Sequence, residues 1–239
     1  MPDPSDDLKD PGGIQHQRSS EIPPPPPYST KGATASTAAQ GSTTYPVQAY
    51  HMPVPECTFA VEYADWKGKG LRVLDKTNGT NTLAYTGTIQ LRKPQLAIQK
   101  IPSSYTDIEN NVHSDTAAFH TLSCKIDMLV HGAAFTLLPH IRLHARFTYT
   151  SPNHPMNARL KWKSRTLFKA FDFDCTSEED GVLVARFSAA NWSIAKVGQL
   201  EIFGQHVADN PKFVDEVVVV ALALAHYSLS QAAAVSIAA

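Results

Sequence analysis

The sequence predicts a mainly β domain, an antiparallel barrel or sandwich, that ends in one apolar helix. Three observations lead to this prediction. Short β-like runs separated by turn signals follow one another from residue 58, with no helical periodicity between them. A segment without any charged residue, 217–239, closes the sequence. The first 55 residues are low in aliphatic side chains and rich in Pro, Ser, Thr, Gln and Ala, so the core is expected to form from the rest.

The N-terminal arm, residues 1–55, is expected to be disordered, because so few apolar side chains cannot offset the entropy of ordering the chain. Its most specific feature is Pro25-Pro26-Pro27-Tyr28, which ends a run of prolines and matches the PPxY ligand of WW domains. A polyproline helix is ordered before binding and docks onto aromatic grooves at a small entropic cost. We predict Pro25, Pro26 and Tyr28 as docking residues for a WW-domain protein such as a ubiquitin ligase. The alternative is a solvated Pro-rich spacer.

The remaining residues, 56–239, are expected to form one domain. Its strongest hairpin signal is Asn78-Gly79, which follows the run 71–74. Further β-like runs are predicted at 83–91, 119–130, 135–147, 158–168, 170–175, 182–187 and 192–203. A loop is expected at 102–116 and a turn at 150–157. Strands at this close spacing are typical of antiparallel barrels and sandwiches.

The final segment, 217–239, is expected to be a helix that is apolar on all sides. Asp215 and Glu216 precede it, as expected at a helix N-terminus, where carboxylates meet the positive end of the helix dipole. Such a helix is either buried in protein or placed in a bilayer. We favour a buried core helix, because the densest apolar part covers only 217–225. A membrane anchor is the alternative.

An ordered set of short motifs runs through 158–224. The motifs are Leu160-Lys161-Trp162-Lys163, Phe171-Asp172-Phe173, Val184-Ala185-Arg186-Phe187-Ser188, Lys196-Val197-Gly198-Gln199-Leu200-Glu201-Ile202 and Asp215-Glu216-Val217-Val218. In this order they resemble the fungal relatives of the LURP-one-related and phospholipid-scramblase branch of the tubby C-terminal-like superfamily. The resemblance covers about 58–230 and implies a closed barrel of about twelve antiparallel strands around a hydrophobic C-terminal helix. Scramblase-like proteins also tend to have Pro-rich N-terminal arms.

A basic face is predicted from 128–171, a stretch that contains no Asp or Glu. Strand alternation places its cations on one side of two strands, 140–147 and 159–165. The candidate residues for an anionic ligand are Arg142, Arg146, Arg159, Lys161, Lys163 and Arg165. If the strands pair through the 148–158 turn, like charges face each other, which is destabilising. The face therefore either binds an anionic ligand, best matched by lipid phosphate, or is neutralised by Asp172, Asp174, Glu178, Glu179 and Asp180.

Other chemistry is not indicated by the sequence. With 21 Lys and Arg against 22 Asp and Glu, the chain is not expected to bind nucleic acid. The cysteines Cys57, Cys124 and Cys175 lack metal-binding or CxxC spacing and are expected to be free, buried thiols. His140 and His144 would lie about 13 Å apart along a strand, too far to share a metal ion. No nucleophile elbow, phosphate loop or paired-carboxylate motif occurs, so we expect no catalytic residue and no cofactor.

The function expected from the sequence is that of a non-enzymatic cytoplasmic module, peripheral at a membrane. Its barrel would bind anionic phospholipid, and its arm would recruit a WW-domain partner. The absence of a signal-peptide pattern after Met1 favours the cytoplasm. The rival from another class is a tail-anchored or scramblase-type membrane protein that uses 217–239 as its membrane segment. An enzyme with the barrel as scaffold is a third hypothesis.

Overall fold

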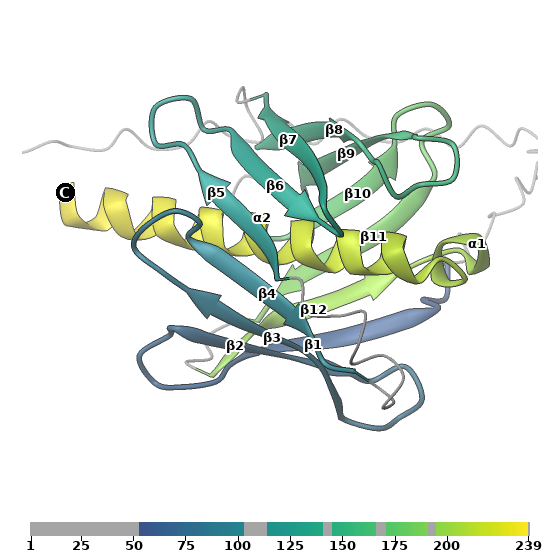
Figure 1. Cartoon of the computed structure of the whole chain (residues 1–239), viewed down its shortest axis with the longest axis horizontal. Coiled ribbons are helices and arrows are strands. Elements are labelled where there is room, and N and C mark those ends of the chain that lie inside the picture. Colours follow the sequence, from purple (N-terminus) through teal and green to yellow (C-terminus); the bar gives the residue numbers. More distant parts are fainter. Residues whose placement is uncertain (1–52, 103–113, 141–144, 166–170, 191–194, 239) are drawn as a thin grey trace, which may run out of the picture. The chain divides into compact units, whose positions relative to one another are not determined.

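Twelve strands and two helices make up the part of the chain that the computed structural model describes, residues 53–102, 114–140, 145–165, 171–190 and 195–238 (Figure 1). The strands are β1 (Cys57–Tyr63), β2 (Gly70–Asp75), β3 (Thr82–Ile89), β4 (Leu96–Lys100), β5 (Asp115–Phe119), β6 (Ile126–Val130), β7 (Ala133–Pro139), β8 (Arg146–Thr150), β9 (Arg159–Ser164), β10 (Phe173–Ser177), β11 (Leu183–Ala189) and β12 (Lys196–Ile202). The helices are α1 (Gln205–Ala208) and α2 (Pro211–Ala238). The predicted docking residues Pro25, Pro26 and Tyr28 lie outside the described residues, as does Arg142.

The strands form a closed antiparallel barrel. Each strand pairs with its neighbours in sequence, and β1 also pairs with β12, which leaves the sheet without a free edge. Gly198 of β12 lies opposite Val61 of β1 and Ala189 of β11. A Cβ atom at this glycine would lie 2.5 Å from the carbonyl oxygen of Ser188, so the close approach of the strands requires glycine here.

Helix α2 fills the barrel (Figure 1). Every residue from Phe213 to Ala225 is buried, among the side chains that alternate inward from the strands. By length and composition alone, the segment Pro211–Ala232 could cross a membrane, yet 78% of its most apolar stretch is buried within the barrel. The prediction of a mainly β, closed barrel of about twelve antiparallel strands around a buried C-terminal helix is therefore confirmed.

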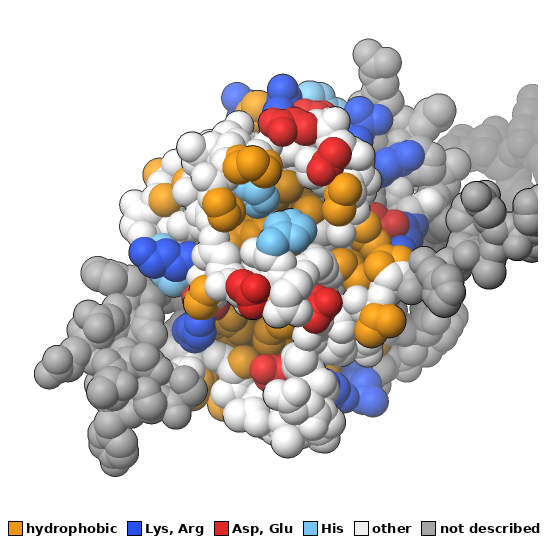
Figure 2. All heavy atoms as spheres, turned by 90° about the vertical axis from the view of Figure 1, so that its right-hand side faces the viewer, with side chains coloured by type: hydrophobic (Ala, Val, Ile, Leu, Met, Phe, Trp, Pro, Cys, Tyr) orange, Lys and Arg blue, Asp and Glu red, His pale blue; other side chains and the backbone are white. Residues whose placement is uncertain are grey.

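The barrel has two distinct ends. At the entry end, where α2 begins, the strands are joined by the turns β2–β3, β6–β7, β8–β9 and β10–β11. At the exit end, where the last turns of α2 emerge, β1–β2, β3–β4 and β5–β6 are joined. Figure 2 faces the entry end and shows acidic side chains spread over it. In the described parts of its connecting segments the carboxylates are Glu178, Glu179, Asp180 and Asp209.

Two of the predicted β runs are each divided between two strands. The run 119–130 is interrupted by a turn, in which the Cys124 N–H donates to the carbonyl oxygen of His120 and Cys124 adopts a φ of 56°. The run 135–147 contains the end of β7 and the start of β8, so 140–147 is not one strand. Cysteine has no strong preference for this left-handed conformation, which explains why the turn at Cys124 escaped prediction.

Two other elements differ from the prediction. Strand β4 was not predicted, although Leu96 and Ile98 alternate inward as expected for a strand. Helix α2 begins at Pro211, four residues before Asp215. Asn210 precedes it, and its side-chain oxygen accepts a hydrogen bond from the Phe213 N–H at 3.2 Å. This is an N-cap followed by proline at the first helical position, a start signal present in the sequence.

Candidate functional site

The outward face of β8 and β9 contains the described residues of the predicted basic face. The two strands pair through the turn after Thr150, with Arg146 opposite Lys163 and Thr148 opposite Lys161. The intervening residues Phe147 and Trp162 face inward and are fully buried. Arg146 and Lys163 are exposed, and Lys161 is half-buried. The predicted alternation of cationic and apolar faces is therefore observed along β9, whereas in β8 it holds for Arg146 and Phe147 and the next residue, Thr148, is also buried.

Two of the predicted basic residues have acidic partners. Arg159 forms an ion pair with Glu178 at 2.8 Å, from Nε to Oε2. Arg165 reaches Asp172 at 3.1 Å and also donates to the hydroxyl of Ser188. At these two positions the face is neutralised within the fold, as the purely structural alternative requires.

Three cations of this face have no such partner. Among the described residues, no carboxylate lies within ion-pair distance of Arg146, Lys161 or Lys163. Asp174 stands opposite Lys163 in the register, but its carboxylate accepts a hydrogen bond from Arg186 at 2.9 Å. The like-charged pair of Arg146 and Lys163 is thus left exposed to solvent.

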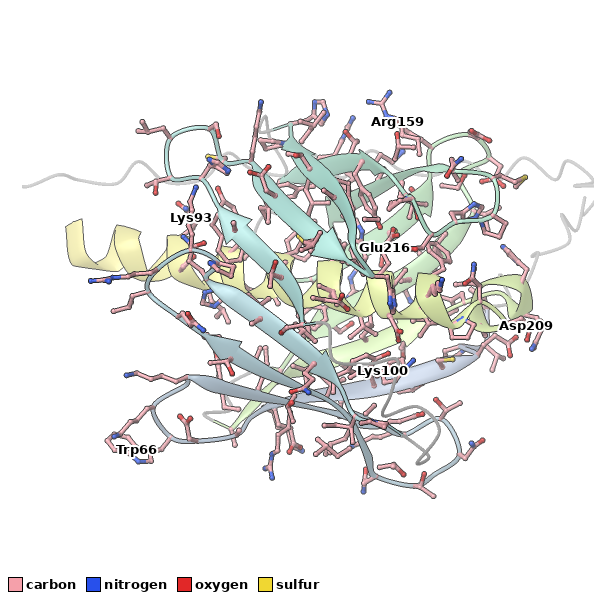
Figure 3. All side chains as sticks on the ribbon, in the orientation of Figure 1. Trp66, Lys93, Lys100, Arg159, Asp209 and Glu216 are labelled. Atoms are coloured by element: carbon pink, nitrogen blue, oxygen red, sulfur yellow. The ribbon has the colours of Figure 1, made fainter. Side chains whose placement is uncertain are left out.

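The main polar cluster inside the barrel surrounds Asp215 of α2. One carboxylate oxygen accepts a hydrogen bond from the Tyr85 hydroxyl at 2.6 Å, and the carboxylate also lies 2.9 Å from the Lys100 Nζ and 3.0 Å from the His131 Nε2. Tyr85 belongs to β3, Lys100 ends β4, and His131 lies in the β6–β7 turn. Three elements of the barrel wall are therefore tied to one carboxylate near the start of α2, in the region of Lys100 and Glu216 in Figure 3.

These contacts shift the ionisation of Asp215 and His131. Burial alone would raise the pKa of Asp215, but hydrogen bonds from His131, Tyr85 and Lys100 outweigh it and hold the pKa below its usual value. The hydrogen bond to Asp215 raises the pKa of His131, although burial opposes this. Both shifts favour the charged pair, which makes this cluster an anchor for the helix.

Glu216 is a second buried carboxylate on the same helix. Its Oε2 accepts hydrogen bonds from the backbone N–H of Asn153 at 3.2 Å and from its side-chain amide at 2.9 Å. Burial raises the pKa of Glu216, and these hydrogen bonds offset that only in part. Asn153 lies in the β8–β9 turn, whose His154 ring packs edge-on against Phe213. The sequence predicts Asp215 and Glu216 immediately before the helix. In the structure both lie within the first turns of α2, and their carboxylates bond residues of the barrel wall.

The described residues offer little other site chemistry. No three His, Cys, Asp or Glu side chains within them are placed to hold a metal ion. The three cysteines are free thiols, but only Cys175 is fully buried, while Cys57 and Cys124 are half-buried. A cavity of about 580 Å³ opens beside the helix anchor and is lined by Tyr85, Lys100 and Asp215. Lys100 and Asp215 are already paired with each other there.

A comparison of the chain with protein-family models, curated proteins and solved structures found no match.

Sequence reasoning missed the partners of the helix anchor. Tyr85, Lys100 and His131 are between 84 and 130 residues away from Asp215 in the sequence, and no local pattern links them. One signal was available: adjacent carboxylates in front of a wholly apolar helix need buried partners if the helix fills a core.

Proposed function

We propose that this chain is a non-enzymatic adaptor that binds anionic phospholipid surfaces through its barrel and recruits a WW-domain protein through its arm. The observation that carries the lipid half is the exposed, like-charged pair of Arg146 and Lys163, with Lys161 beside it. Like charges directly opposite each other on paired strands weaken a sheet. An anionic ligand that bridges them would offset this repulsion.

The proposed lipid site is narrower than the basic face predicted from sequence. Arg159 and Arg165 are engaged by Glu178 and Asp172, so they are left out of the proposed contact. The remaining cations, Arg146, Lys161 and Lys163, would attract the phosphate and carboxylate groups of anionic lipids. Nucleic acid is not proposed as a partner, because the balanced charge of the chain gives no long-range attraction to it.

The resemblance to the tubby C-terminal-like superfamily supports the same proposal. The closed barrel around a central helix is the fold which that resemblance implies. The burial of α2 favours a peripheral, cytoplasmic protein over a tail-anchored or scramblase-type protein. An anchor formed by 217–239 would have to leave the barrel and break the contacts of Asp215 and Glu216.

The test is vesicle sedimentation of the full chain with the variant Lys161→Glu/Lys163→Glu. Each basic residue near an anionic surface contributes roughly 1 kcal/mol, so replacing two attractions by two repulsions should weaken binding by more than about tenfold. The melting temperature should be unchanged, since both side chains point out of the core. If the variant binds phosphatidylserine vesicles as well as the parent, these lysines are only a solvated surface.

The WW half of the proposal rests on Pro25, Pro26 and Tyr28 and is tested separately. A pull-down of the full chain with an isolated WW domain should be lost on Tyr28→Ala, because the aromatic groove loses its terminal contact. The paired variant Tyr45→Ala, a tyrosine of the same arm outside the motif, should retain binding.

A further inference from the structure

Three turns at the exit end of the barrel carry large apolar side chains that no other described residue covers. They are the β1–β2 turn (64–69), the β3–β4 turn (90–95) and the β5–β6 turn (120–125), which we call the exit tips. Trp66 is 86% exposed, Leu91 101% and Leu122 100%. Each tip thus presents one large apolar residue to solvent, and three such residues at one end of a barrel are an unusual concentration of exposed apolar surface.

The same tips are rich in cations. They contain five Lys or Arg residues and a single acidic residue, Asp65; the cations are Lys67, Lys69, Arg92, Lys93 and Lys125. All five cations are exposed. The Lys67 Nζ lies 5.4 Å from the centre of the Trp66 ring, so charge and aromatic surface are adjacent. Figure 3 shows Trp66 and Lys93 on the side of the barrel from which α2 emerges.

The entry end has the opposite charge. Its described connecting segments carry Glu178, Glu179, Asp180 and Asp209 against Lys76. Exposed apolar residues occur there too, as at Met156 and Val182, but without a surrounding set of cations. The combination of apolar tips and basic neighbours therefore distinguishes the exit end.

Helix α2 continues beyond the barrel at this end. Tyr227 still packs on Phe119 and Phe147, at the end of β5 and the start of β8. From Leu229 to Ala232 the helix is exposed, and it continues to Ala238 without any charged residue. The three exit tips and the end of α2 lie on the same side of the barrel (Figure 1), so the exit end combines basic, apolar-tipped turns with the uncharged end of a helix.

We propose that the exit end is the surface that lies against an anionic bilayer, with Trp66, Leu91 and Leu122 entering the headgroup region. This inference rests on the proposed lipid binding and specifies its orientation. Tryptophan favours the membrane interface, and lysines and arginines beside it meet anionic headgroups. A bilayer can accept three separate apolar tips because it deforms around each of them, whereas a protein partner would need a matching pocket for each.

The position of the cations without an ion-pair partner among the described residues fits this orientation. Arg146 is the first residue of β8, and Lys163 lies next to the last residue of β9. Both therefore lie near the exit end of the barrel wall, while the neutralised Arg159 lies toward the entry end. If the exit tips contact a bilayer, Arg146 and Lys163 lie close to the bilayer surface.

The test compares two variants of the full chain on vesicles of phosphatidylserine and phosphatidylcholine. Trp66→Ser/Leu91→Ser/Leu122→Ser should weaken sedimentation by at least about tenfold, because it removes the side chains that enter the bilayer. Its melting temperature should match that of the parent, since the three side chains are exposed. The matched control Met156→Ser/Val182→Ser, at the entry end, should bind like the parent.

Insertion itself is measured with brominated lipids, which quench tryptophans that enter the bilayer. The parent should be quenched, and the component due to Trp66 should disappear in Trp66→Phe, while binding remains. Equal quenching of the two proteins would overturn the inference.

The remaining outcomes separate this inference from the proposed function. If the exit-tip variant binds like the parent while Lys161→Glu/Lys163→Glu does not, the orientation is wrong and lipid binding stands. If the parent binds no vesicles, both fail. If the parent is then dimeric on gel filtration and the exit-tip variant monomeric, the exit tips contact a second copy of the chain instead.

Discussion

Removal of the Asp215 carboxylate probes how the helix is held in the barrel. In Asp215→Ala the Tyr85 hydroxyl loses its acceptor, and the side chains of Lys100 and His131 lose the carboxylate between them. Breaking a buried ion pair costs about 3–5 kcal/mol. The Lys100 and His131 side chains are 37% and 24% exposed, so water can solvate them in part and the lower value applies. We expect a loss of about 3 kcal/mol in the free energy of unfolding.

The assay for this prediction is thermal and urea unfolding at neutral pH. For a domain of this size, 1 kcal/mol corresponds to about 2–4 °C, so Asp215→Ala should melt about 6–12 °C below the parent. Asp127→Ala is the matched control, because this carboxylate also bonds a histidine and a hydroxyl but is 52% exposed. It should cost less than about 1 kcal/mol. Equal melting temperatures for Asp215→Ala and Asp127→Ala would refute the idea that the carboxylate anchors the helix.

Further predictions concern the core, the arm and pH. Leu222→Asp buries an unpaired charge among the strands and should make the domain insoluble or protease-sensitive; a soluble variant that unfolds cooperatively would contradict the buried position of α2. Trp162→Ala should cost about 3–5 kcal/mol in unfolding experiments and change vesicle binding only through this loss of stability. Tyr28→Ala should abolish WW-domain binding at an unchanged melting temperature, so a lower melting temperature would show that the arm contributes to the fold. The contribution of His131 to stability should be complete below its usual pKa of 6.5 and be lost as pH rises through its higher folded pKa. Melts from acidic to alkaline pH should therefore show a decline above 6.5 in the parent and not in His131→Asn, a residue that also accepts the φ of 49°.

The parts of the fold that follow local rules could be predicted from the sequence. The hairpin predicted around Asn78-Gly79 forms between β2 and β3, with Gly79 at a positive φ of 73°, although the connection covers 76–81 and is longer than a two-residue turn. The inward position of Trp162 followed from strand alternation alone. The uncharged helix was assigned to the core because its apolar segment is short, and α2 is indeed buried.

The parts that depend on long-range pairing could not be predicted. The start of β8 at Arg146 is defined by its partner Lys163, whereas the sequence suggested that the strand continued from 140. Neutralisation of Arg165 by Asp172 was foreseen as one alternative, because the residues are close in sequence. The cluster at Asp215 was not, since its partners come from three distant elements. The exit tips also escaped prediction, because turn residues become a surface only when a closed barrel gathers them at one end.

The most direct test of the account is sedimentation of the unmodified full chain with vesicles over a salt series. We predict binding to vesicles that contain phosphatidylserine and much weaker binding to pure phosphatidylcholine. The binding should weaken as salt rises, because the screening length shortens from about 10 Å at 0.1 M to about 3 Å at 1 M. No binding to either vesicle, or equal and salt-independent binding to both, would contradict the proposal that the basic residues of the barrel recognise an anionic membrane.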